Sequence, residues 1–230
     1  MFNDHFLNAG GKVQEPRNSR AERDVYLKRM NNILFKFSLV TNNDVRLIFK
    51  DITPKNSTGI DDLSTRVLKS IQEPLIPILC IIINQSLING VFPSKLKLAK
   101  VKPLYKKDDA SQFENYRPIS LLPVISKVFE KVVHKQVYDY FVSNNLFFRN
   151  QYGYRKYHST EHAALELVDR IYESLDKGEI PITIFLDLSK AFDTINHSIL
   201  LEKTSKVWLS FRRAQLVHQL FIRKNAMRRL

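Results

Sequence analysis

The sequence predicts a protein of the α+β class, in which helices dominate and strands are few and short. Two long stretches, 126–141 and 160–175, carry apolar residues at the spacing of a helix with one buried face. A third stretch, 95–102, largely alternates lysine with apolar residues, as a half-buried strand does. A chain of 230 residues can bury a core, as one large domain or two small ones.

The N-terminal part is expected to be a flexible leader followed by helices. Residues 1–24 mix glycine, asparagine and alternating charges without periodicity, which is typical of a flexible segment. Apolar residues then recur at helical spacing, and the break at 41–44 offers a cap for the second of these helical segments. Further helices are predicted at about 63–71 and 75–88.

A β-hairpin with a lysine-lined face is predicted next. In SKLKLAKVKPLYKK the alternating lysines are Lys95, Lys97, Lys100 and Lys102. The turn KKDDASQFENY then leads to a second short strand, RPISLL. No acidic residue occurs between Ser94 and Lys107, so we expect a local cationic ridge, although a merely solvated lysine face would show the same pattern.

Two helices and a buried strand are predicted beyond the hairpin. The helix at 126–141 is followed by one that starts at the Ser159/Thr160 cap, turns its apolar residues inward and stops before Gly178. The run IPITIFL is rich in β-branched residues, which favours a buried strand that ends at Asp187.

The charge balance favours a polyanionic partner. The chain carries 36 Lys+Arg against 23 Asp+Glu, which suggests nucleic acid before membrane, with a merely basic protein as the alternative. The single cysteine, Cys80, excludes an internal disulfide and fits an intracellular location in cytoplasm or nucleus. The first 25 residues lack an apolar signal region, and prolines break the longest apolar stretch, so no membrane is expected.

The segment IFLDLSKAFDTINH (Ile184–His197) poses the question of catalysis. A carboxylate at the end of a buried strand lies where a sheet meets solvent, a suitable place to hold Mg²⁺. Asp193 follows beyond a turn and need not point the same way as Asp187. Taken alone, Asp187 is more simply explained as the cap of a following turn or helix, since aspartate is common there.

Longer strings resemble the reverse transcriptases of LINE-type, non-LTR retrotransposons. FLDLSKAFDTINH resembles their first catalytic motif, NYRPISLLPVISKVFEKVV their fingers hairpin and next helix, and NQYGYRKYHSTEHAALELVDRI the following block, which grips the template. KNSTGIDDL and LINGVFPSKLKLAKVKPLYKKDD match the region before the fingers. The blocks occur in the right order, so the resemblance covers roughly residues 40–203.

The resemblance implies the fingers and partial palm of a right-hand polymerase, helix-rich with a fingers hairpin and a palm strand. The implied activity is RNA-templated DNA synthesis by two-metal nucleotidyl transfer, with Mg²⁺, or Mn²⁺ in its place. The implied partners are an RNA template, a DNA primer and dNTPs. The implied organisation after the leader is a helical N-terminal extension at 25–93, fingers and the start of the palm at 94–203, and a basic divergent tail at 204–230.

The resemblance also implies roles for single residues. Asp187 matches the aspartate that ligates both catalytic metal ions, and the carbonyl of Leu188 would add a ligand. Phe192 matches the aromatic gate that excludes a 2′-hydroxyl by leaving no room for it.

Arg117 matches the fingers arginine that holds the dNTP triphosphate, with Lys106 or Lys107 assisting from the other strand. Arginine suits this task because its planar fork pairs bidentately with phosphate oxygens. Tyr154 stands where the family more commonly has phenylalanine. Three neighbours match the same block and are implied to contact the template or the nascent base pair: Gln151, Gly153 and Arg155.

A competing pattern is HSTEH, His158–His162, which formally matches the H-x-x-E-H arrangement of zinc proteases. That chemistry needs both histidines on one face of a continuous helix. Because His158 precedes the Ser159/Thr160 cap, we expect the two rings to diverge, and the resemblance to reverse transcriptases takes precedence.

Two motifs of the family are absent from the sequence, the Gly-rich motif B and the Y/FADD hairpin of motif C, and no aspartate follows Asp193. We therefore expect Mg²⁺ to bind weakly and the chain to be catalytically inactive by itself. After Lys203 the resemblance fades into an acid-free tail, which suggests a frameshift or an aberrant exon junction. The alternative is a genuine basic amphipathic helix with Leu209, Leu216 and Leu220 on one side.

Two other functions stay open. The chain would also be explained as a non-catalytic nucleic-acid-binding remnant that uses the cationic ridge and the basic tail. A pseudogene product without function is the third possibility.

Overall fold

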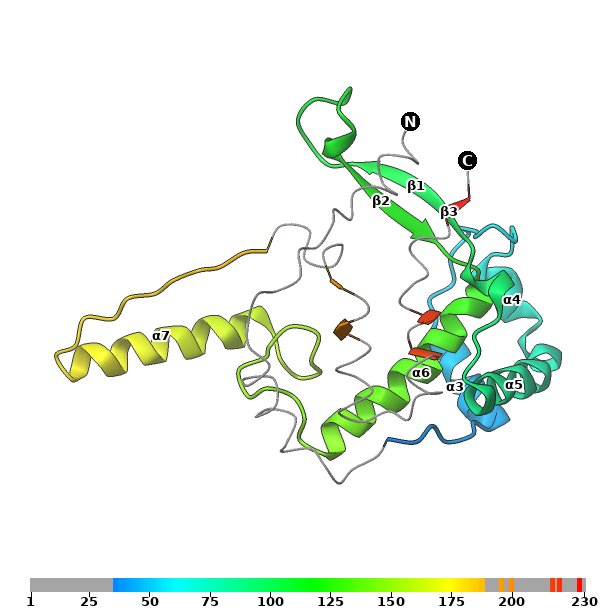
Figure 1. The fold of residues 1–230 in the computed structure, drawn as a ribbon, viewed down its shortest axis with the longest axis horizontal. Helices are drawn as coiled ribbons and strands as arrows, with labels where there is room; N and C mark the ends of the chain where they lie inside the picture. The colour runs from blue at the N-terminus through cyan, green and yellow to red at the C-terminus, as the bar shows by residue number, and fades with distance from the viewer. Residues whose placement is uncertain are drawn as a thin grey trace. The chain divides into compact units, whose positions relative to one another are not determined.

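The computed structural model describes residues 35–188, with the short stretches 195–196, 199–200, 216–217, 219–220 and 227–228 (Figure 1). The predicted leader at 1–24 lies outside the described residues. The chain divides into two compact units: the first is Met1–Val137 with Ala191–Leu230, and the second is Tyr138–Lys190. The described part is rich in helix and contains one antiparallel hairpin, which agrees with the predicted α+β class.

Helix α3 (Asn42–Asp51) begins at the predicted cap. The hydroxyl oxygen of Thr41 accepts a hydrogen bond from the Asp44 N–H (3.2 Å), and the Asp44 carboxylate accepts one from the Thr41 N–H (2.8 Å). These reciprocal bonds satisfy donors that the first helical turn leaves without partners. The hydroxyl of Thr41, and then its N–H, hold the pKa of Asp44 below its usual range by favouring the charged carboxylate.

Helix α5 (Gln72–Asn89) follows the short α4 (Thr65–Ser70) and packs against α3. The Asn84 side chain joins α5 to the segment just before α3, since it accepts a bond from the Val40 N–H (2.8 Å) and donates one to the Val40 carbonyl (2.9 Å). Gly90 ends α5 with φ of 69°, a conformation that glycine adopts without steric cost. Apolar as α5 is, no helix in the described part is both long and apolar enough to cross a bilayer.

The predicted hairpin forms, but its first strand starts later than expected. Residues Ser94–Lys97 make a 3-10 turn, η1, and strand β1 is Ala99–Tyr105. The Leu96 N–H donates to the Pro93 carbonyl (3.1 Å), a short-range bond that an extended strand could not make. Strand β1 pairs antiparallel with β2 (Tyr116–Leu121), the second predicted strand.

Helix α6 (Val124–Ser143) confirms the helix predicted at 126–141 and supports the base of the hairpin. The buried Ser126 hydroxyl donates to the Leu96 carbonyl (2.8 Å). The rings of Phe92 and Phe129 meet edge to face with centroids 5.4 Å apart. Figure 1 shows α3, α4 and α5 grouped beside the first turns of α6, with the hairpin rising from the same place. Further buried residues on this part of α6 are Val124, Val128, Val132 and Val133.

Part of the basic tail packs into the core of the first unit, to which it belongs. Leu216 is 1% exposed and Val217 is also buried. Strand β3 (Met227–Arg228) runs parallel to β1, opposite Ala99 and Lys100. The burial of Leu216 favours the alternative of a genuine segment over a frameshift. The predicted amphipathic helix is untested as a whole, because Leu209 lies outside the described residues.

Gln219 ties this tail to the turn between α5 and η1. Its side-chain oxygen accepts bonds from the Phe92 N–H and the Lys97 ammonium, both at 2.9 Å. Its amide nitrogen donates to the Gly90 carbonyl at 3.2 Å. One amide side chain thus satisfies three polar groups of the turn, which a buried turn requires.

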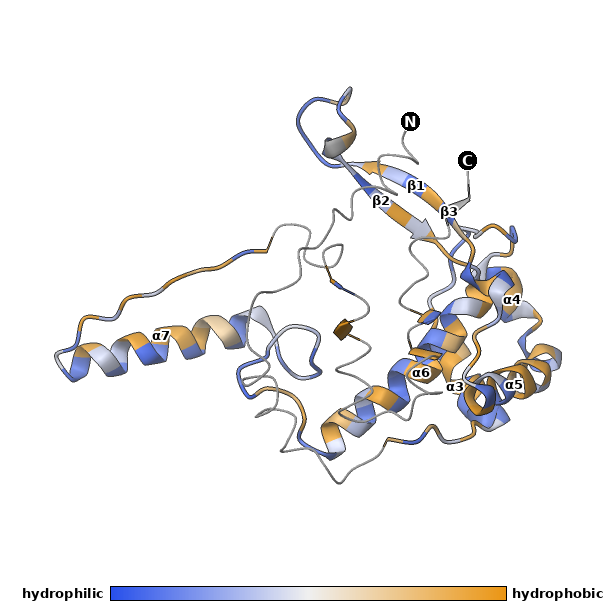
Figure 2. Ribbon diagram, in the orientation of Figure 1, coloured by the Kyte–Doolittle hydropathy of each residue, from blue (hydrophilic) through white to orange (hydrophobic). Residues whose placement is uncertain are grey.

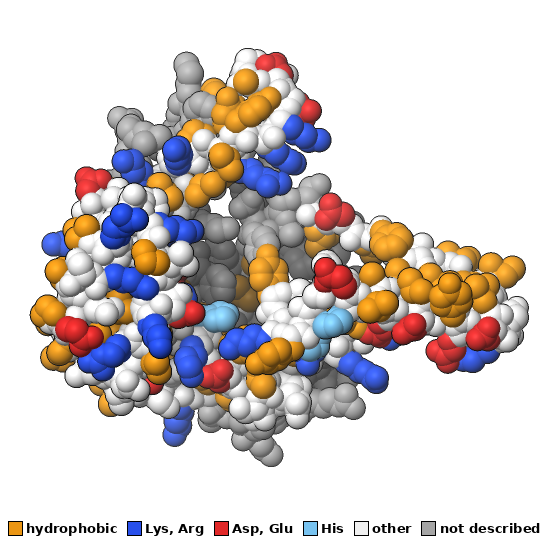
Figure 3. All heavy atoms as spheres, turned by 180° about the vertical axis from the view of Figure 1, so that it is seen from behind, with side chains coloured by type: hydrophobic (Ala, Val, Ile, Leu, Met, Phe, Trp, Pro, Cys, Tyr) orange, Lys and Arg blue, Asp and Glu red, His pale blue; other side chains and the backbone are white. Residues whose placement is uncertain are grey.

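Helix α7 (Thr160–Asp176) in the second unit begins at the predicted Ser159 cap, whose oxygen accepts a bond from the His162 N–H (3.3 Å). The prediction that its apolar face turns inward is wrong, because α7 has no buried residue and this face is mostly exposed. The second unit offers α7 no further layer of described structure against which to bury that face. Figure 3 shows hydrophobic side chains at the surface of this part of the molecule. The exposed residues are Leu165, Val168, Tyr172 and Leu175.

The buried strand predicted for IPITIFL is also wrong. Residues 179–188 run without strand hydrogen bonds, and most of their apolar side chains are exposed, Leu186 to 89%. Figure 2 shows the hydrophobic colour of this irregular segment. A strand needs neighbouring strands to pair its backbone groups, and none of the described strands pairs with this segment. Asp187 therefore does not stand at the end of a strand.

Replacing Leu216 tests whether the tail belongs to the folded core. Leu216→Ala is expected to destabilise the chain by about 2–4 kcal/mol, because it removes a buried side chain and leaves a cavity. Ile180→Ala is the matched control, since its side chain is 90% exposed and the change should stay within about 0.5 kcal/mol. Urea unfolding followed by circular dichroism measures both, and an unchanged stability of Leu216→Ala would contradict the packing of the tail.

Candidate nucleic-acid interface

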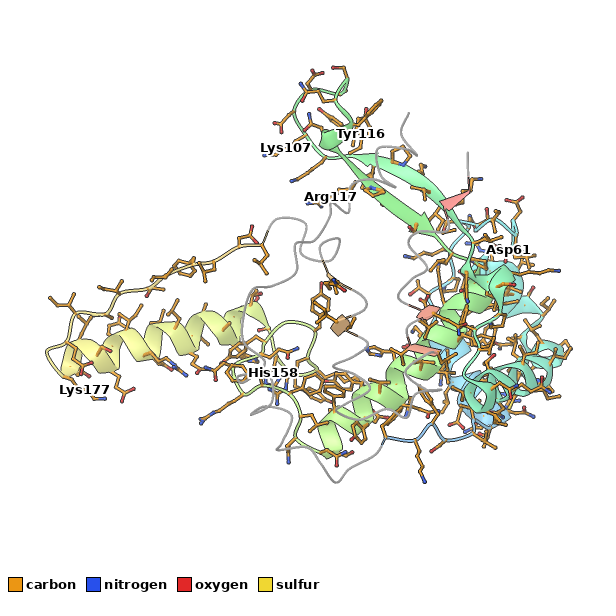
Figure 4. The ribbon with its side chains drawn as sticks, in the orientation of Figure 1. Asp61, Lys107, Tyr116, Arg117, His158 and Lys177 are labelled. Carbon is orange, nitrogen blue, oxygen red and sulfur yellow. The ribbon has the colours of Figure 1, made fainter. Side chains whose placement is uncertain are left out.

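The predicted site residues fall into both units. Figure 4 shows Lys107 and Arg117 on the hairpin, extending from the same side of it. Phe192 lies outside the described residues. The predicted residues that belong to the second unit are Gln151, Gly153, Arg155, Asp187 and Leu188.

The strand register makes one face of the hairpin basic. Cross-strand partners share a face and successive residues alternate between faces, so Lys100, Lys102 and Arg117 lie on the same face. We call these three residues the basic face. Lys102 and Arg117 are exposed, Lys100 is half-buried, and Arg117 forms no ion pair with any residue that the structure describes. The lysine-lined face is thus confirmed for the strand, whereas Lys95 and Lys97 lie in η1.

The hairpin loop is shaped by its own polar groups. The Lys106 N–H donates to the Asn115 carbonyl (2.8 Å) where the strands end. Asp109 accepts bonds from the Ser111 N–H (2.9 Å) and hydroxyl (2.8 Å), which hold the pKa of Asp109 below its usual range. The Lys107 ammonium is 4.0 Å from the Asp108 carboxylate, and both are so exposed that this pair contributes little. Both lysines therefore remain at the surface of a fixed loop.

Gln151, Gly153 and Arg155 come together in a single loop, 144–159, of the second unit. The Gln151 amide donates to the Gly153 carbonyl (3.2 Å), and the Arg155 guanidinium donates to two carbonyls earlier in the loop (3.4 Å each). Gln151 and Arg155 thus hold the loop in shape. A Cβ atom built on Gly153 would meet nothing within 4 Å.

Two tyrosines of this loop were given no role by the interpretation of the sequence. Tyr154 is 87% exposed and Tyr157 is 95% exposed. The pattern that could have revealed them is QYGYRKYH, in which aromatic residues alternate with cations and no acid intervenes. Such interleaving is typical of surfaces that bind single-stranded nucleic acid.

Asp187 and Leu188 lie on the exposed, irregular segment 179–188. Two-metal chemistry needs several carboxylates that converge on ions about 3.5–4 Å apart. Among the described residues, no group of three or more His, Cys, Asp or Glu side chains is placed to hold a metal ion. The described residues do not fit a Mg²⁺ site by themselves, since Asp187 offers a single carboxylate.

His158 and His162 do not share a continuous helix. His158 lies before α7, with its ring against Tyr152 (centroids 5.8 Å apart) and its Nδ1 2.9 Å from the Lys156 carbonyl oxygen (Figure 4). The Ser159 cap separates it from His162 in the first helical turn. A zinc-protease pair requires both histidines on one helical face, so this geometry disfavours that alternative.

Both units therefore present cations suited to phosphate groups. The hairpin offers Lys102 and Arg117, and the 144–159 loop offers Arg149 and Lys156, all of them exposed. Arginine can pair bidentately with phosphate oxygens, and lysine acts as a point charge. This arrangement is suited to binding a polyanion rather than to acid–base chemistry.

Comparison with known protein families agrees with this chemistry. Residues 104–228 match the family described as reverse transcriptase (RNA-dependent DNA polymerase). The match starts within β1 and continues past residue 203, where the resemblance was predicted to fade. The tail is therefore similar to the family as well as packed on the first unit.

Several curated proteins of transposable elements are similar to the chain. "Probable RNA-directed DNA polymerase from transposon BS" of Drosophila melanogaster is 31% identical over 160 residues, 69% of this chain and 18% of that protein. The RNA-directed DNA polymerase from mobile element jockey is 26% identical over 184 residues in Drosophila melanogaster, 80% of this chain and 20% of that protein. Its counterpart in Drosophila funebris is 29% identical over 169 residues, 73% of this chain and 18% of that protein. The chain spans about a fifth of the length of these relatives.

Two glycine substitutions test which of these glycines the folded structure needs for its stability. Gly153→Ala is expected to leave the melting temperature unchanged, because the added Cβ meets open space. Gly59→Ala should destabilise the chain by about 1–3 kcal/mol, since its Cβ would lie 2.8 Å from the Pro123 nitrogen and 2.9 Å from the Leu122 carbonyl carbon. Differential scanning calorimetry compares the two variants. A loss of stability in Gly153→Ala would show that this glycine serves the fold.

Proposed function

The chain belongs to the reverse transcriptase family of LINE-type, non-LTR retrotransposons, and from that premise we propose that it binds the RNA template and the incoming dNTP during DNA synthesis. The observation that carries the proposal is the basic face, on which Lys100, Lys102 and Arg117 lie together. Arg117 lies within the matched region, and the two lysines lie just before its start. Template and dNTP both carry phosphate groups, and this face offers cations to them. None of the described residues on this face carries a carboxylate that would compete for these cations.

The β1–β2 hairpin acts as the fingers hairpin in this proposal. Arg117 holds the triphosphate of the dNTP, and Lys106 or Lys107 assists from the end of β1. Two features support these roles: Arg117 is exposed on the basic face, and hydrogen bonds within the loop fix the backbone that carries the lysines. An arginine that no described acid engages keeps its donors available for a ligand.

The 144–159 loop contacts the template or the nascent base pair. Gly153 contributes by letting a ligand approach the backbone closely, which the open space at its Cα supports. Gln151 and Arg155 contribute by holding the loop, as their hydrogen bonds to backbone carbonyls support.

Asp187 and the carbonyl of Leu188 are proposed as ligands for Mg²⁺, or Mn²⁺ in its place, at the start of the palm. Phe192 is proposed as the aromatic gate that excludes a 2′-hydroxyl. The exposed position of segment 179–188 supports access of a ligand to Asp187. A single carboxylate binds a hard divalent cation weakly, because such ions take six or more oxygen ligands.

We propose four segments along the chain. Residues 1–24 form the leader, 25–93 the helical extension, 94–203 the fingers and the start of the palm, and 204–230 the basic tail. The contacts of Gln219 with the turn before η1 support a role of the tail in holding the base of the fingers hairpin.

The second candidate function is a nucleic-acid-binding remnant without polymerase activity. It is favoured by the net charge of +13 together with the exposed cations of the hairpin and of the 144–159 loop. Both candidates bind RNA through the same cations. They differ in whether the chain also binds the incoming dNTP and takes part in DNA synthesis.

A salt titration tests RNA binding by the basic face. Lys102→Gln should weaken binding of a short single-stranded RNA and lower the slope of log K against log [salt] by about 0.7, since one phosphate contact is lost. Lys177→Gln is the matched control, because this exposed lysine already pairs with Glu173 at 2.7 Å on α7. Fluorescence anisotropy over a range of salt concentrations measures both, and RNA binding that is indifferent to salt would contradict the proposal.

Primer extension tests whether the chain, by itself, joins nucleotides. The purified 230-residue chain, given an RNA template, an annealed DNA primer, dNTPs and Mg²⁺, is expected to yield no extended product. An active reverse transcriptase in parallel reactions controls for the substrates. Clear cDNA synthesis that disappears in Asp187→Ala would overturn the proposed inactivity and identify Asp187 as catalytic.

A further inference from the structure

Two tyrosines of the 144–159 loop are mostly exposed. Tyr154 and Tyr157 are 87% and 95% exposed, and both have positive φ, 58° and 62°. Residues with large side chains rarely adopt this left-handed conformation. It persists where the surrounding contacts hold the backbone, and it is concentrated at binding sites.

The residues between the tyrosines are anchored to the end of α6. The Lys156 N–H donates to the Tyr138 hydroxyl (2.8 Å), and the Lys156 ammonium lies 5.2 Å from the centre of the Tyr138 ring. The Arg155 guanidinium lies 5.6 Å from the centre of the Phe147 ring, which itself packs 5.3 Å from Tyr138. These contacts fix the short segment that carries both tyrosines, so that the exposed rings sit on a supported backbone.

The charges of the loop indicate which kind of ligand it binds. No acidic residue occurs from Asn144 to His158, whereas three cations do: Arg149, Arg155 and Lys156. Arg149 and Lys156 are exposed. A purely apolar partner would gain nothing from this acid-free, cationic setting. A partner that combines flat aromatic faces with regularly spaced negative charge fits both features.

We propose that Tyr154 and Tyr157 stack on unpaired bases of a single-stranded nucleic acid, while Arg149 and Lys156 contact its phosphates. Base pairs in a duplex hide their faces in the stack, so an exposed ring can stack only on a base that is unpaired. Stacking tolerates every base, which suits a protein that must accept any template sequence. This inference deepens the proposed function, on which it rests, by assigning the loop to the unpaired part of the template.

Aromatic and aliphatic variants test the stacking directly. Tyr154→Leu and Tyr157→Leu should each weaken binding of a short single-stranded RNA about 10-fold, whereas Tyr154→Phe and Tyr157→Phe should change it less than about 3-fold. Tyr172→Leu is the matched control, an exposed tyrosine on α7 outside the loop. Anisotropy of the labelled RNA gives the affinity, and circular dichroism confirms that each variant keeps its fold. An RNA carrying 2-aminopurine gives a second readout, since stacking on tyrosine quenches its fluorescence.

The possible outcomes distinguish a failure of the stacking proposal from a failure of the proposed function. If the unchanged chain binds RNA in a salt-dependent manner and the leucine variants bind equally well, the stacking proposal is wrong and the proposed function stands. Equal losses in the leucine and phenylalanine variants, or in Tyr172→Leu, would also refute stacking. If the unchanged chain fails to bind RNA at all, both proposals fall. Loss confined to the leucine variants and to single-stranded RNA, with a paired duplex of the same sequence bound as before, supports stacking.

Discussion

The hydrogen bond from the Ser126 hydroxyl to the Leu96 carbonyl joins the base of the hairpin to the helical core. Ser126 is fully buried, so this bond satisfies a polar group that would otherwise be costly to keep out of water. The edge-to-face contact of Phe92 with Phe129 secures the same junction from the apolar side. An isolated two-stranded hairpin is marginally stable in water, so β1 and β2 depend on this junction and on the pairing of β1 with β3.

The position of the basic face depends on the strand register of this hairpin. The antiparallel register places Leu104 opposite Arg117 and Lys102 opposite Ile119, and it thereby fixes which side chains share a face. A shift of one residue in this register would move Arg117 to the opposite face and separate it from Lys102. Gln219 reinforces the arrangement from the tail, because it occupies the polar groups of the turn that leads into η1.

The second unit is held together by contacts other than a buried apolar core. Its loop is held by aromatic rings and cations, as where Lys156 lies over Tyr138, and α7 buries none of its residues. The apolar face of α7 and the side chains of 179–188 together leave hydrophobic surface in contact with water. Exposed apolar patches of this kind commonly mark sites where further protein packs. The relatives are about four times as long as this chain, so they contain further protein that is available to pack on such a face.

Local patterns in the sequence were sufficient where neighbours along the chain do the stabilising. The Thr41–Asp44 capping box, the Ser159 cap and the amphipathic face of α6 all follow from contacts within a few residues, and each was predicted correctly. The family also followed from the sequence, since strings such as FLDLSKAFDTINH are specific enough by themselves. Long-range contacts decided the rest. IPITIFL has the composition of a strand, but a strand needs a partner, and no described strand pairs with it. Likewise, no local pattern marks Gln219, whose role comes from groups about 120 residues away in the sequence that only the fold brings within hydrogen-bonding distance.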